Sequence, residues 1–472
     1  MPALADGSQI QSKKASAESK TLFYEPGAEQ FLYFYNGIYY RYINNFVVSR
    51  SNSGLNLATS EDGVHWKDHG LVIGYPTTVA AVDTSDIWSV HDEHGTKFIT
   101  SFCEWSGPSN QVKDYLSWRA KFTFLESRDL MHWTRLSPKY DTHPDTRWYQ
   151  PNERWSFMYT APRPGGGLYG YWSAVAKDKQ SGFGMGESLD GVNWRTLKPA
   201  PMEGVPYPLM PTIPWMKIPE LSALHAWRGK YYAIVTAWDE EHPGTIDNPG
   251  MNTLIADSPF GPFRPAPKNL RLLASMTSYW VRFVDTPDGV LASCRSWELS
   301  ADGLKRLRQY LAPFKRAEWD EEGTLRLKWW EGNEKAKLKR VHIESQLVET
   351  AFDPNEVLIL EGIMTLLPTP TGLYLQGTAD KGTGFLVHRN GMVEYGDINR
   401  DGSNFEKKGY VDRELSFEGR ACFRIIRTGR ITEFYLNNYL MQCYCLPEQG
   451  TGRIGLIGAA RDFQELNAWY CA

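Results

Sequence analysis

Short runs of alternating apolar and polar residues, separated by glycine-containing turns, recur along this chain from about residue 21 onward. The segment Phe31-Leu-Tyr-Phe-Tyr-Asn-Gly-Ile-Tyr-Tyr40 shows the pattern: two apolar stretches flank an Asn-Gly pair, which predicts a β-hairpin. Similar strand-turn-strand segments begin at Asp86, Trp155, Leu221 and Trp280. No long amphipathic helix interrupts them, so the pattern predicts an all-β protein.

A second pattern repeats roughly every 60–70 residues and marks the outer part of each unit. Its three clear copies are Ser60-Glu-Asp-Gly-Val-His-Trp66, Ser127-Arg-Asp-Leu-Met-His-Trp133 and Ser188-Leu-Asp-Gly-Val-Asn-Trp194, followed by the degenerate Asp257-Ser-Pro-Phe-Gly-Pro-Phe263. Asp and Gly suit a tight turn, and we expect the final aromatic ring to pack between neighbouring sheets. Five such units fit between about residues 21 and 335, which predicts a five-bladed β-propeller.

The pattern changes after about residue 340, where short alternating strands and frequent Gly or Asn turns run to the C-terminus. This part predicts an antiparallel β-sandwich. We expect the charged stretch 318–337 to close the last blade and lead into a linker. The predicted organisation is a polar, disordered tail at 1–20, a propeller catalytic domain at 21–338 and a β-sandwich domain at 339–472.

Composition narrows the classes of function. The net charge is −4 and no polybasic stretch occurs, which argues against nucleic-acid and membrane-surface binding. No apolar run is long enough for a transmembrane helix. The polar first 20 residues lack the apolar core of a signal peptide and no N-x-S/T sequon occurs, so we expect a cytoplasmic protein, with a trimmed secretion signal left open.

Cysteine and histidine usage predicts neither a metal nor a cofactor. The six cysteines form no CxxC pair, and the ten histidines form no H-E-x-x-H or H-x-H cluster. Cys443 and Cys445 are expected to face the same side of a strand and to pack as small apolar residues. No P-loop or dinucleotide-binding motif occurs. The glycine run Gly165-Gly-Gly167 lies between predicted strands and is better explained as a rim loop than as a phosphate-binding loop.

The aromatic content of 14%, with 18 Trp and 25 Tyr, has two explanations. Aromatic rings act as wedges between sheets in all-β proteins, and they also provide flat surfaces on which sugars stack. Composition alone favours the structural explanation, and a family resemblance adds weight to the second.

A five-bladed propeller followed by a β-sandwich resembles the β-fructosidase superfamily, which contains glycoside hydrolase families 32, 43 and 68. Phe423-Arg-Ile-Ile-Arg-Thr-Gly-Arg-Ile-Thr-Glu-Phe-Tyr-Leu-Asn437 resembles a sandwich hairpin of family 32, and the Gly-x-Tyr-Tyr strands after Gly37 and Gly229 resemble inner strands of family 43. The resemblance covers most of the chain in architecture but only short motifs in sequence. It implies three carboxylates on the innermost strands of different blades, converging on the propeller axis.

Glycoside hydrolysis needs a protonated acid for the leaving oxygen and a carboxylate that acts as nucleophile or base. In family 43 the acidic residue lies eight or nine residues before the turn glycine of its blade, and this spacing selects Glu220 as general acid and Glu29 as base or nucleophile. Chain order selects Asp145 as the third carboxylate. Glu25 and Asp141 remain local rivals, and the D-P and R-D-P strings of the related families are absent.

Further residues are candidates for substrate binding. Asp86 lies nine residues before Gly95, with Asp83 as its rival. The fifth blade contains two arginines, Arg282 and Arg295. Each could bind a carboxylate or hydroxyl group in the pocket, or could form a structural ion pair. The aromatic candidates for sugar stacking are Trp88, Trp148 and Trp215, each of which also suits blade packing.

These observations predict an exo-acting glycoside hydrolase that releases a non-reducing-end sugar, with an oligosaccharide or glycoside as its partner. The resemblance favours a furanoside, such as a fructofuranoside or arabinofuranoside, while the fifth-blade arginines leave an acidic sugar open. The alternatives are a transglycosylase of the same chemistry, a non-catalytic carbohydrate-binding propeller, and a protein-interaction propeller. Homo-oligomerisation also remains open.

Overall fold

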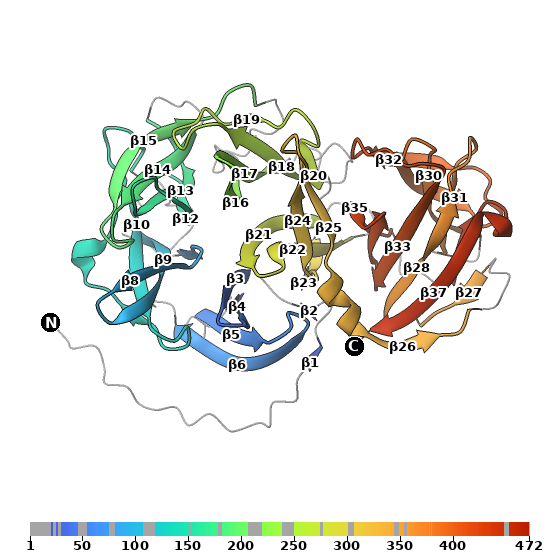
Figure 1. The fold of residues 1–472 in the computed structure, drawn as a ribbon, viewed down its shortest axis with the longest axis horizontal. Helices are drawn as coiled ribbons and strands as arrows, with labels where there is room; N and C mark the ends of the chain where they lie inside the picture. Colours follow the sequence, from blue (N-terminus) through green and yellow to red (C-terminus); the bar gives the residue numbers. More distant parts are fainter. Residues whose placement is uncertain are drawn as a thin grey trace.

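The computed structural model describes residues 20–21, 25–26, 30–45, 54–74, 81–106, 119–151, 153–177, 182–205, 220–237, 250–273, 277–300, 306–343, 349–353, 356–376, 378, 380–447 and 453–471. The predicted tail at 1–20 lies almost wholly outside these residues. The described chain is a ring of five antiparallel sheets joined to a two-sheet sandwich, as Figure 1 shows. The prediction of a five-bladed propeller followed by a β-sandwich is therefore confirmed.

The first three blades follow one another around the ring, with β3 of blade I and β12 of blade III lying innermost (Figure 1). Blade I contains β3 (Gln30–Tyr35), β4 (Ile38–Asn45), β5 (Gly54–Ser60) and β6 (His65–Gly74), with β1 (Lys20–Thr21) at its edge. Blade II contains β7 (Ala81–Thr84), β8 (Trp88–Asp92), β9 (Gly95–Ser106), β10 (Arg119–Ser127) and β11 (Thr134–Arg135), followed by the 3₁₀ turn η3 (Pro138–Tyr140). Blade III contains β12 (Trp155–Pro162), β13 (Leu168–Ala174), β14 (Gly182–Ser188) and β15 (Arg195–Pro201).

Blades IV and V complete the ring. Blade IV contains β16 (Glu220–Trp227), β17 (Lys230–Ala237), β18 (Gly250–Ala256), β19 (Arg264–Pro265) and β20 (Arg271–Leu273). Blade V contains β21 (Ser278–Thr286), β22 (Gly289–Leu299), β23 (Arg306–Leu311), β24 (Lys315–Trp319) and β25 (Leu325–Trp329). The ring is closed by β2 (Glu25–Pro26), which precedes blade I in the chain but pairs with β23 of blade V. This closure ties the start of the propeller to its end.

The C-terminal sandwich follows the 3₁₀ helix η4 (Glu331–Ala336). One sheet contains β26 (Lys337–Val341), β28 (Val357–Thr365), β33 (Arg420–Thr428), β34 (Ile431–Leu436), β35 (Tyr439–Cys445) and β37 (Phe463–Cys471). The other contains β27 (Glu349–Ala351), β29 (Thr371–Gln376), β30 (Lys381–Val387), β31 (Val393–Asn399), β32 (Glu406–Val411) and β36 (Arg453–Ile457), with η5 (Ala460–Asp462) before β37. Strand β35 pairs with β25 of blade V through Lys328 and Tyr439, so one continuous sheet links the two parts.

The repeated turn is built the same way in the three clear copies. In the first copy the Ser60 hydroxyl donates to Asp62 at 3.1 Å, and Asp62 accepts the backbone N–H of His65 at 2.8 Å. Asp129 and Asp190 accept the equivalent backbone N–H groups at 2.8 and 2.7 Å. Burial opposes ionisation of Asp62, but hydrogen bonds from His65 and Val64 outweigh it and lower its pKa to about 2. The predicted turn geometry is therefore confirmed.

The core is divided among the blade interfaces and the interior of the sandwich. Trp66 is 3% exposed and packs where blade I meets blade V, beside Phe314. Cys443 and Cys445 are both buried thiols on one strand, as the sequence predicts. No helix among the described residues is long and apolar enough to cross a membrane.

Candidate active site on the propeller axis

The innermost strands of three blades carry an irregularity at the same level, close to the axis. The register shifts between Ser156 and Tyr159 in β12, between Leu221 and Ala223 in β16, and between Tyr279 and Arg282 in β21. A β-bulge interrupts the alternation of side chains, so the residues that follow it point in a direction that a regular strand would not give them. These bulges therefore decide which side chains meet on the axis.

Two large aromatic residues at the bulges adopt left-handed backbone conformations. Phe157 has φ 62° and Trp280 has φ 61°, a region that bulky L-residues rarely occupy. Their rings contact each other edge to face, with centroids 4.4 Å apart and an angle of 62° between the ring planes. Strained backbone of this kind persists only where the surrounding structure enforces it, and it concentrates at functional sites.

Glu220 lies at the entrance to this aromatic cluster. It is the first residue of β16, only 7% of its surface is exposed, and Arg154 Nη2 lies 2.6 Å from its Oε1. Arg154 precedes β12, donates through Nε to Ser156 Oγ at 2.7 Å, and has its guanidinium 5.3 Å from the Phe157 ring centroid. The side chains of blades III and IV thus meet in one charged pair at the axis.

Asp86 reaches the same cluster from blade II. It lies between β7 and β8, where its backbone N–H donates to the Met158 carbonyl of blade III at 3.1 Å. Its Oδ1 is 3.7 Å from Nη1 of Arg282, and its side chain is 23% exposed, whereas Arg282 is completely buried. The predicted residues Glu220, Asp86 and Arg282 are therefore brought together around the axial aromatic rings, although Arg282 has no exposed surface with which to touch a substrate.

Arg295 lies beside this cluster on the second strand of blade V. Its guanidinium is 5.6 Å from the Trp280 ring centroid and 6.0 Å from that of Trp297. This stacking of an arginine on both tryptophans agrees with the alternation of side chains along a strand, which puts residues two apart, such as Arg295 and Trp297, on one face. It also places a second cation of blade V near the axis.

Several predicted residues fall outside the described part of the chain. Glu29 and Trp215 lie in undescribed segments. Glu25 belongs to β2 and Asp83 to β7, but their side chains are not among those that the structure describes. The roles of these residues remain predictions.

Asp145 occupies a tight turn before β12. It accepts the Arg147 backbone N–H at 2.9 Å and pairs with Arg147 Nη2 at 2.6 Å, and these interactions lower its pKa below the ordinary value. The rival Asp141 pairs instead with Lys121 of β10 at 2.6 Å. Trp148, 36% exposed, follows this turn. The described contacts join neither aspartate to Glu220, so the catalytic role of Asp145 remains a prediction.

The structure removes Trp88 from the candidate substrate site. This side chain is 4% exposed and donates from Nε1 to the Gly191 carbonyl at 3.0 Å. Its ring packs edge-to-face on Trp194 at 5.8 Å, between blades II and III. A ring held in this interface has no face available for a sugar. Trp88 therefore packs between sheets, which is the structural explanation for the high aromatic content, and does not stack on a substrate.

Arg154 is the residue of this cluster that the sequence did not reveal. The signal was present: the charged pair Glu153-Arg154 stands directly before the apolar strand β12, as Glu220 stands at the start of β16. Charged residues at the mouth of an innermost strand are therefore the pattern to search for. Spacing to the turn glycine missed Arg154 because that spacing was applied to acidic residues, and because the turn glycines of blade III, Gly165–Gly167, lie further along the chain from Arg154 than Gly229 lies from Glu220.

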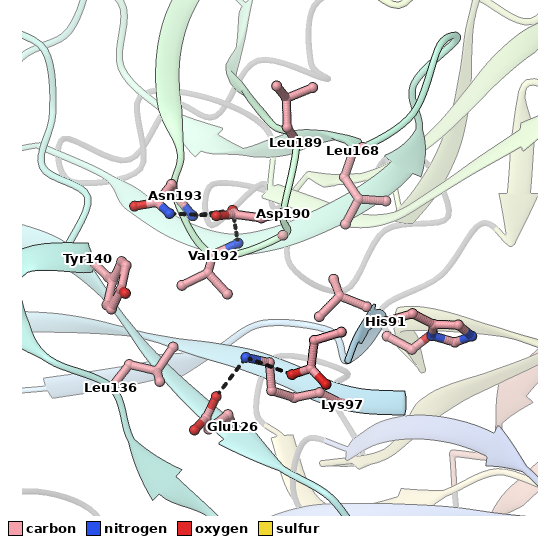
Figure 2. Close-up of a pocket in the computed structure, with 15 residues that line it drawn as sticks. His91, Lys97, Glu126, Leu136, Tyr140, Leu168, Leu189, Asp190, Val192 and Asn193 are labelled. Carbon is pink, nitrogen blue, oxygen red and sulfur yellow. Dashed lines mark hydrogen bonds and ion pairs between the residues drawn. The ribbon is translucent and has the colours of Figure 1, made fainter. Parts of the chain in front are cut away.

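A separate cavity of about 690 Å³ lies at the rim between blades II and III (Figure 2). On one side Lys97 Nζ lies 3.0 Å from Glu126, and on the other Asn193 donates to Asp190 at 2.5 Å, with apolar side chains including Val192 between them. The cavity contains Asp92, the last residue of β8, whereas Glu220 is the first residue of β16, so the two features lie at opposite ends of the innermost strands. None of the predicted site residues that the structure describes lines this cavity.

The described residues contain no group of three or more His, Cys, Asp or Glu side chains placed to hold a metal ion. The chemistry available on the axis is that of carboxylates, guanidinium groups and aromatic rings. Such groups supply proton transfer, charge stabilisation and hydrogen bonds to hydroxyls.

No protein-family model and no curated protein sequence matches the chain. Solved structures do match it. A family 32 β-fructofuranosidase from Bombyx mori aligns with a TM-score of 0.65 and 11% identity over 95% of this chain and 93% of its own. Sucrose-6-phosphate hydrolase from Lactobacillus gasseri aligns with a TM-score of 0.66 and 12% identity over 95% of this chain and 92% of its own. Exo-inulinase from Aspergillus awamori aligns with a TM-score of 0.61 and 11% identity over 96% of this chain and 98% of its own. The chain therefore has the propeller-and-sandwich fold of the family 32 glycoside hydrolases.

Proposed function

We propose that this chain is an exo-acting glycoside hydrolase whose axial site binds one non-reducing-end sugar. The observation that carries the proposal is Glu220, a nearly buried carboxylate at the start of an innermost strand. It pairs with Arg154, whose guanidinium lies over the strained Phe157, and the same ring lies beside Arg282, the partner of a second carboxylate, Asp86. A buried titratable group beside convergent polar side chains is the usual arrangement of a catalytic site. The shared fold supports this assignment by analogy.

In the proposed reaction Glu220 donates a proton to the glycosidic oxygen as the bond to the sugar breaks. A second carboxylate attacks the anomeric carbon or activates water, and the positive charge on the sugar ring is stabilised by nearby carboxylates. The ion pair with Arg154 competes with this role, because protonation of Glu220 removes the charge that attracts the arginine. The proposal therefore requires Arg154 to move away from Oε1 when substrate enters.

Glu29 is the proposed partner carboxylate, and Asp145 the proposed third acidic group. Glu153 is a further candidate because it lies next to Arg154 at the mouth of β12 and is only partly exposed. A partner about 5–5.5 Å from Glu220 would predict retention of configuration, and a separation of about 6.5–9.5 Å would predict inversion. Replacing each of these three acids by its amide separates the assignments.

The proposed substrate is a furanoside, with a β-fructofuranoside first. The structural matches are named β-fructofuranosidase, sucrose-6-phosphate hydrolase and exo-inulinase, and all three names describe enzymes of fructosides. The acidic-sugar alternative rests on Arg154 and Arg295 near the axis. Transglycosylation remains a variant of the same chemistry.

The test is product release from sucrose, inulin, aryl β-fructofuranosides and aryl arabinofuranosides by the wild type and by Glu220→Gln. We expect one sugar to be released and the variant to lose roughly 10³-fold in kcat/KM. Leu189→Asp provides the control, because Leu189 is 76% exposed in the distant rim cavity and its change should leave hydrolysis intact. Full activity in Glu220→Gln contradicts the assignment of the acid.

A non-catalytic carbohydrate-binding propeller is the second candidate. The Arg154–Glu220 ion pair favours it, because a carboxylate held by an arginine suits hydroxyl recognition as well as proton donation. Retained sugar binding by both proteins, with no release of product from any glycoside, would establish this alternative.

A further inference from the structure

Arg282 occupies an unusual position for a charged residue. It is 0% exposed, although arginine is almost never fully buried without partners. It directly follows the bulge in β21, and this bulge shifts the alternation of the strand by one residue. Because a shift of one residue reverses the face to which a side chain points, the bulge directs Arg282 towards the propeller axis.

The partners of Arg282 come from all five blades. Its guanidinium lies 4.7 Å from the ring centroid of Phe31 in blade I and pairs with Asp86 in blade II at 3.7 Å. Nη1 donates to the Tyr159 hydroxyl of blade III and to the Ser222 carbonyl of blade IV, the latter at 3.4 Å. Trp280 of blade V, two residues earlier, has its ring centroid 5.1 Å away.

The three bulges and the left-handed residues produce this arrangement together. Tyr159 follows the bulge of β12, Ser222 is the extra residue of β16, and Trp280 is in the bulge of β21. Aromatic faces at about 5 Å stabilise a guanidinium by cation–π attraction, which is stronger where water is excluded. The aromatic cage and the carbonyl therefore compensate the desolvation of Arg282.

We propose that Arg282 is a positioning residue of the axial site: it ties the five blades together and holds the Asp86 carboxylate in place to accept a sugar hydroxyl. This inference rests on the proposed function of the site. Arg282 itself does not touch the substrate, since no part of its side chain is exposed. Asp86, with 23% of its side chain exposed, is the group through which it acts.

The test is a double-mutant cycle with Arg282→Met and Asp86→Asn, measured both by thermal unfolding and by steady-state kinetics on the substrate found for the wild type. We expect each single variant to raise KM by about tenfold or more, a loss typical of one charge-assisted hydrogen bond. The double variant should have the KM of Asp86→Asn alone, because Arg282 acts through Asp86. Arg282→Lys keeps the charge and should recover part of the loss, but not all of it, because lysine lacks the planar fork.

Arg41→Met is the matched control. Arg41 is also a buried arginine of the propeller, 4% exposed and 4.0 Å from the Trp66 ring centroid, but it lies on the second strand of blade I. It should lower the melting temperature without raising KM. If Arg282→Met behaves in the same way, or if its effect on KM multiplies with that of Asp86→Asn, Arg282 is only structural and the inference is wrong.

Thermal unfolding separates this inference from the proposed function. The losses in melting temperature of Arg282→Met and Asp86→Asn should be less than additive, because each removes the same ion pair. Additive losses would overturn the link between the two residues whether or not the protein hydrolyses a glycoside. An inactive wild type would overturn the proposed function and leave this measurement intact.

Discussion

Replacing Lys315 by methionine is expected to destabilise the chain strongly, because it leaves the Glu433 carboxylate buried without its cation. Lys315 begins β24 of blade V, Glu433 lies in β34 of the sandwich, and their charged groups are 2.5 Å apart with neither side chain exposed. Lys315 Nζ also donates to the Pro313 carbonyl at 2.9 Å, and the Tyr435 hydroxyl donates to Glu433 at 2.5 Å. The pair therefore joins the propeller to the sandwich.

The magnitude follows from this geometry. Removing one member of a buried ion pair costs about 3–5 kcal/mol, since the remaining charge has lost both water and its partner. Methionine is unbranched and only one atom shorter than lysine, so the loss reports the charge more than the packing. A domain has roughly 5–15 kcal/mol of stability in all, so a loss of this size is a large fraction.

The full loss of stability in Lys315→Met should be seen at neutral pH. Burial opposes the charge of Lys315, but Glu433 and nearby thiols outweigh it and raise its pKa above the ordinary 10.5. A lysine whose pKa is raised by folding contributes its full stability below its ordinary pKa and loses it only as the pH rises through the folded value. The pair is therefore intact at pH 7.

Equilibrium urea unfolding at pH 7, followed by tryptophan fluorescence, measures the loss. Lys230→Met serves as the control, because Lys230 pairs with Asp257 at 2.9 Å on the surface and should cost less than about 1 kcal/mol. Lys315→Met/Glu433→Gln should lose less than the sum of its two single variants. A loss for Lys315→Met as small as that of the control, or an additive double variant, would refute this reasoning.

Three further outcomes follow from particular contacts. Arg154→Met removes the cation that pairs with Glu220 Oε1, and because that pair competes with the role of Glu220 as acid, kcat/KM on the substrate found for the wild type should rise; an unchanged kcat/KM counts against Glu220 as the acid. Asp62→Asn should lower the free energy of unfolding by about 1 kcal/mol at pH 7. Folding lowers the pKa of Asp62 from 3.8 to about 2, so the difference in unfolding free energy between Asp62→Asn and wild type should shrink as the pH falls through this range. Urea unfolding at several pH values measures this difference, and a difference that stays constant would contradict the prediction. Gly184→Ala should lower the free energy of unfolding by about 1–3 kcal/mol, because the new Cβ would lie 2.0 Å from Nε1 of the fully buried Trp172. Gly37→Ala is the control: its new Cβ meets no neighbouring atom, so it should show only the penalty of a left-handed backbone (φ 80°).

Local patterns predicted the architecture because their causes are local. The Ser-x-Asp motif carries its own turn, since the Asp62 carboxylate reaches backbone N–H groups only two and three residues away. The alternation of apolar residues assigns strands, and the switch in pattern near residue 340 coincides with the start of the sandwich sheets. Spacing also selected Glu220 and Asp86, which the structure pairs with Arg154 and Arg282 and whose roles stay predictions.

The same spacing failed where long-range packing changes the backbone. Trp88 satisfies the pattern of a sugar-stacking residue, yet a contact with Gly191, 103 residues away, places it between blades. Arg154 has no turn glycine at the expected distance, and only its contact with Glu220 shows its place in the site. Arg282 gave two explanations from sequence, a clamp or a structural ion pair, and its complete burial supports the second, with Asp86 as the partner.

The sequence by itself determined the strands, the repeated turns and the order of five blades followed by a sandwich, because hydrophobic alternation and turn chemistry act over a few residues. Only the tertiary structure decided which side chains meet on the axis and at the domain junction. Bulges at Phe157 and Trp280 reverse the direction of the residues after them, and they are held by rings 123 positions apart in the chain. Such contacts depend on how the blades close into a ring, and no local pattern encodes that closure.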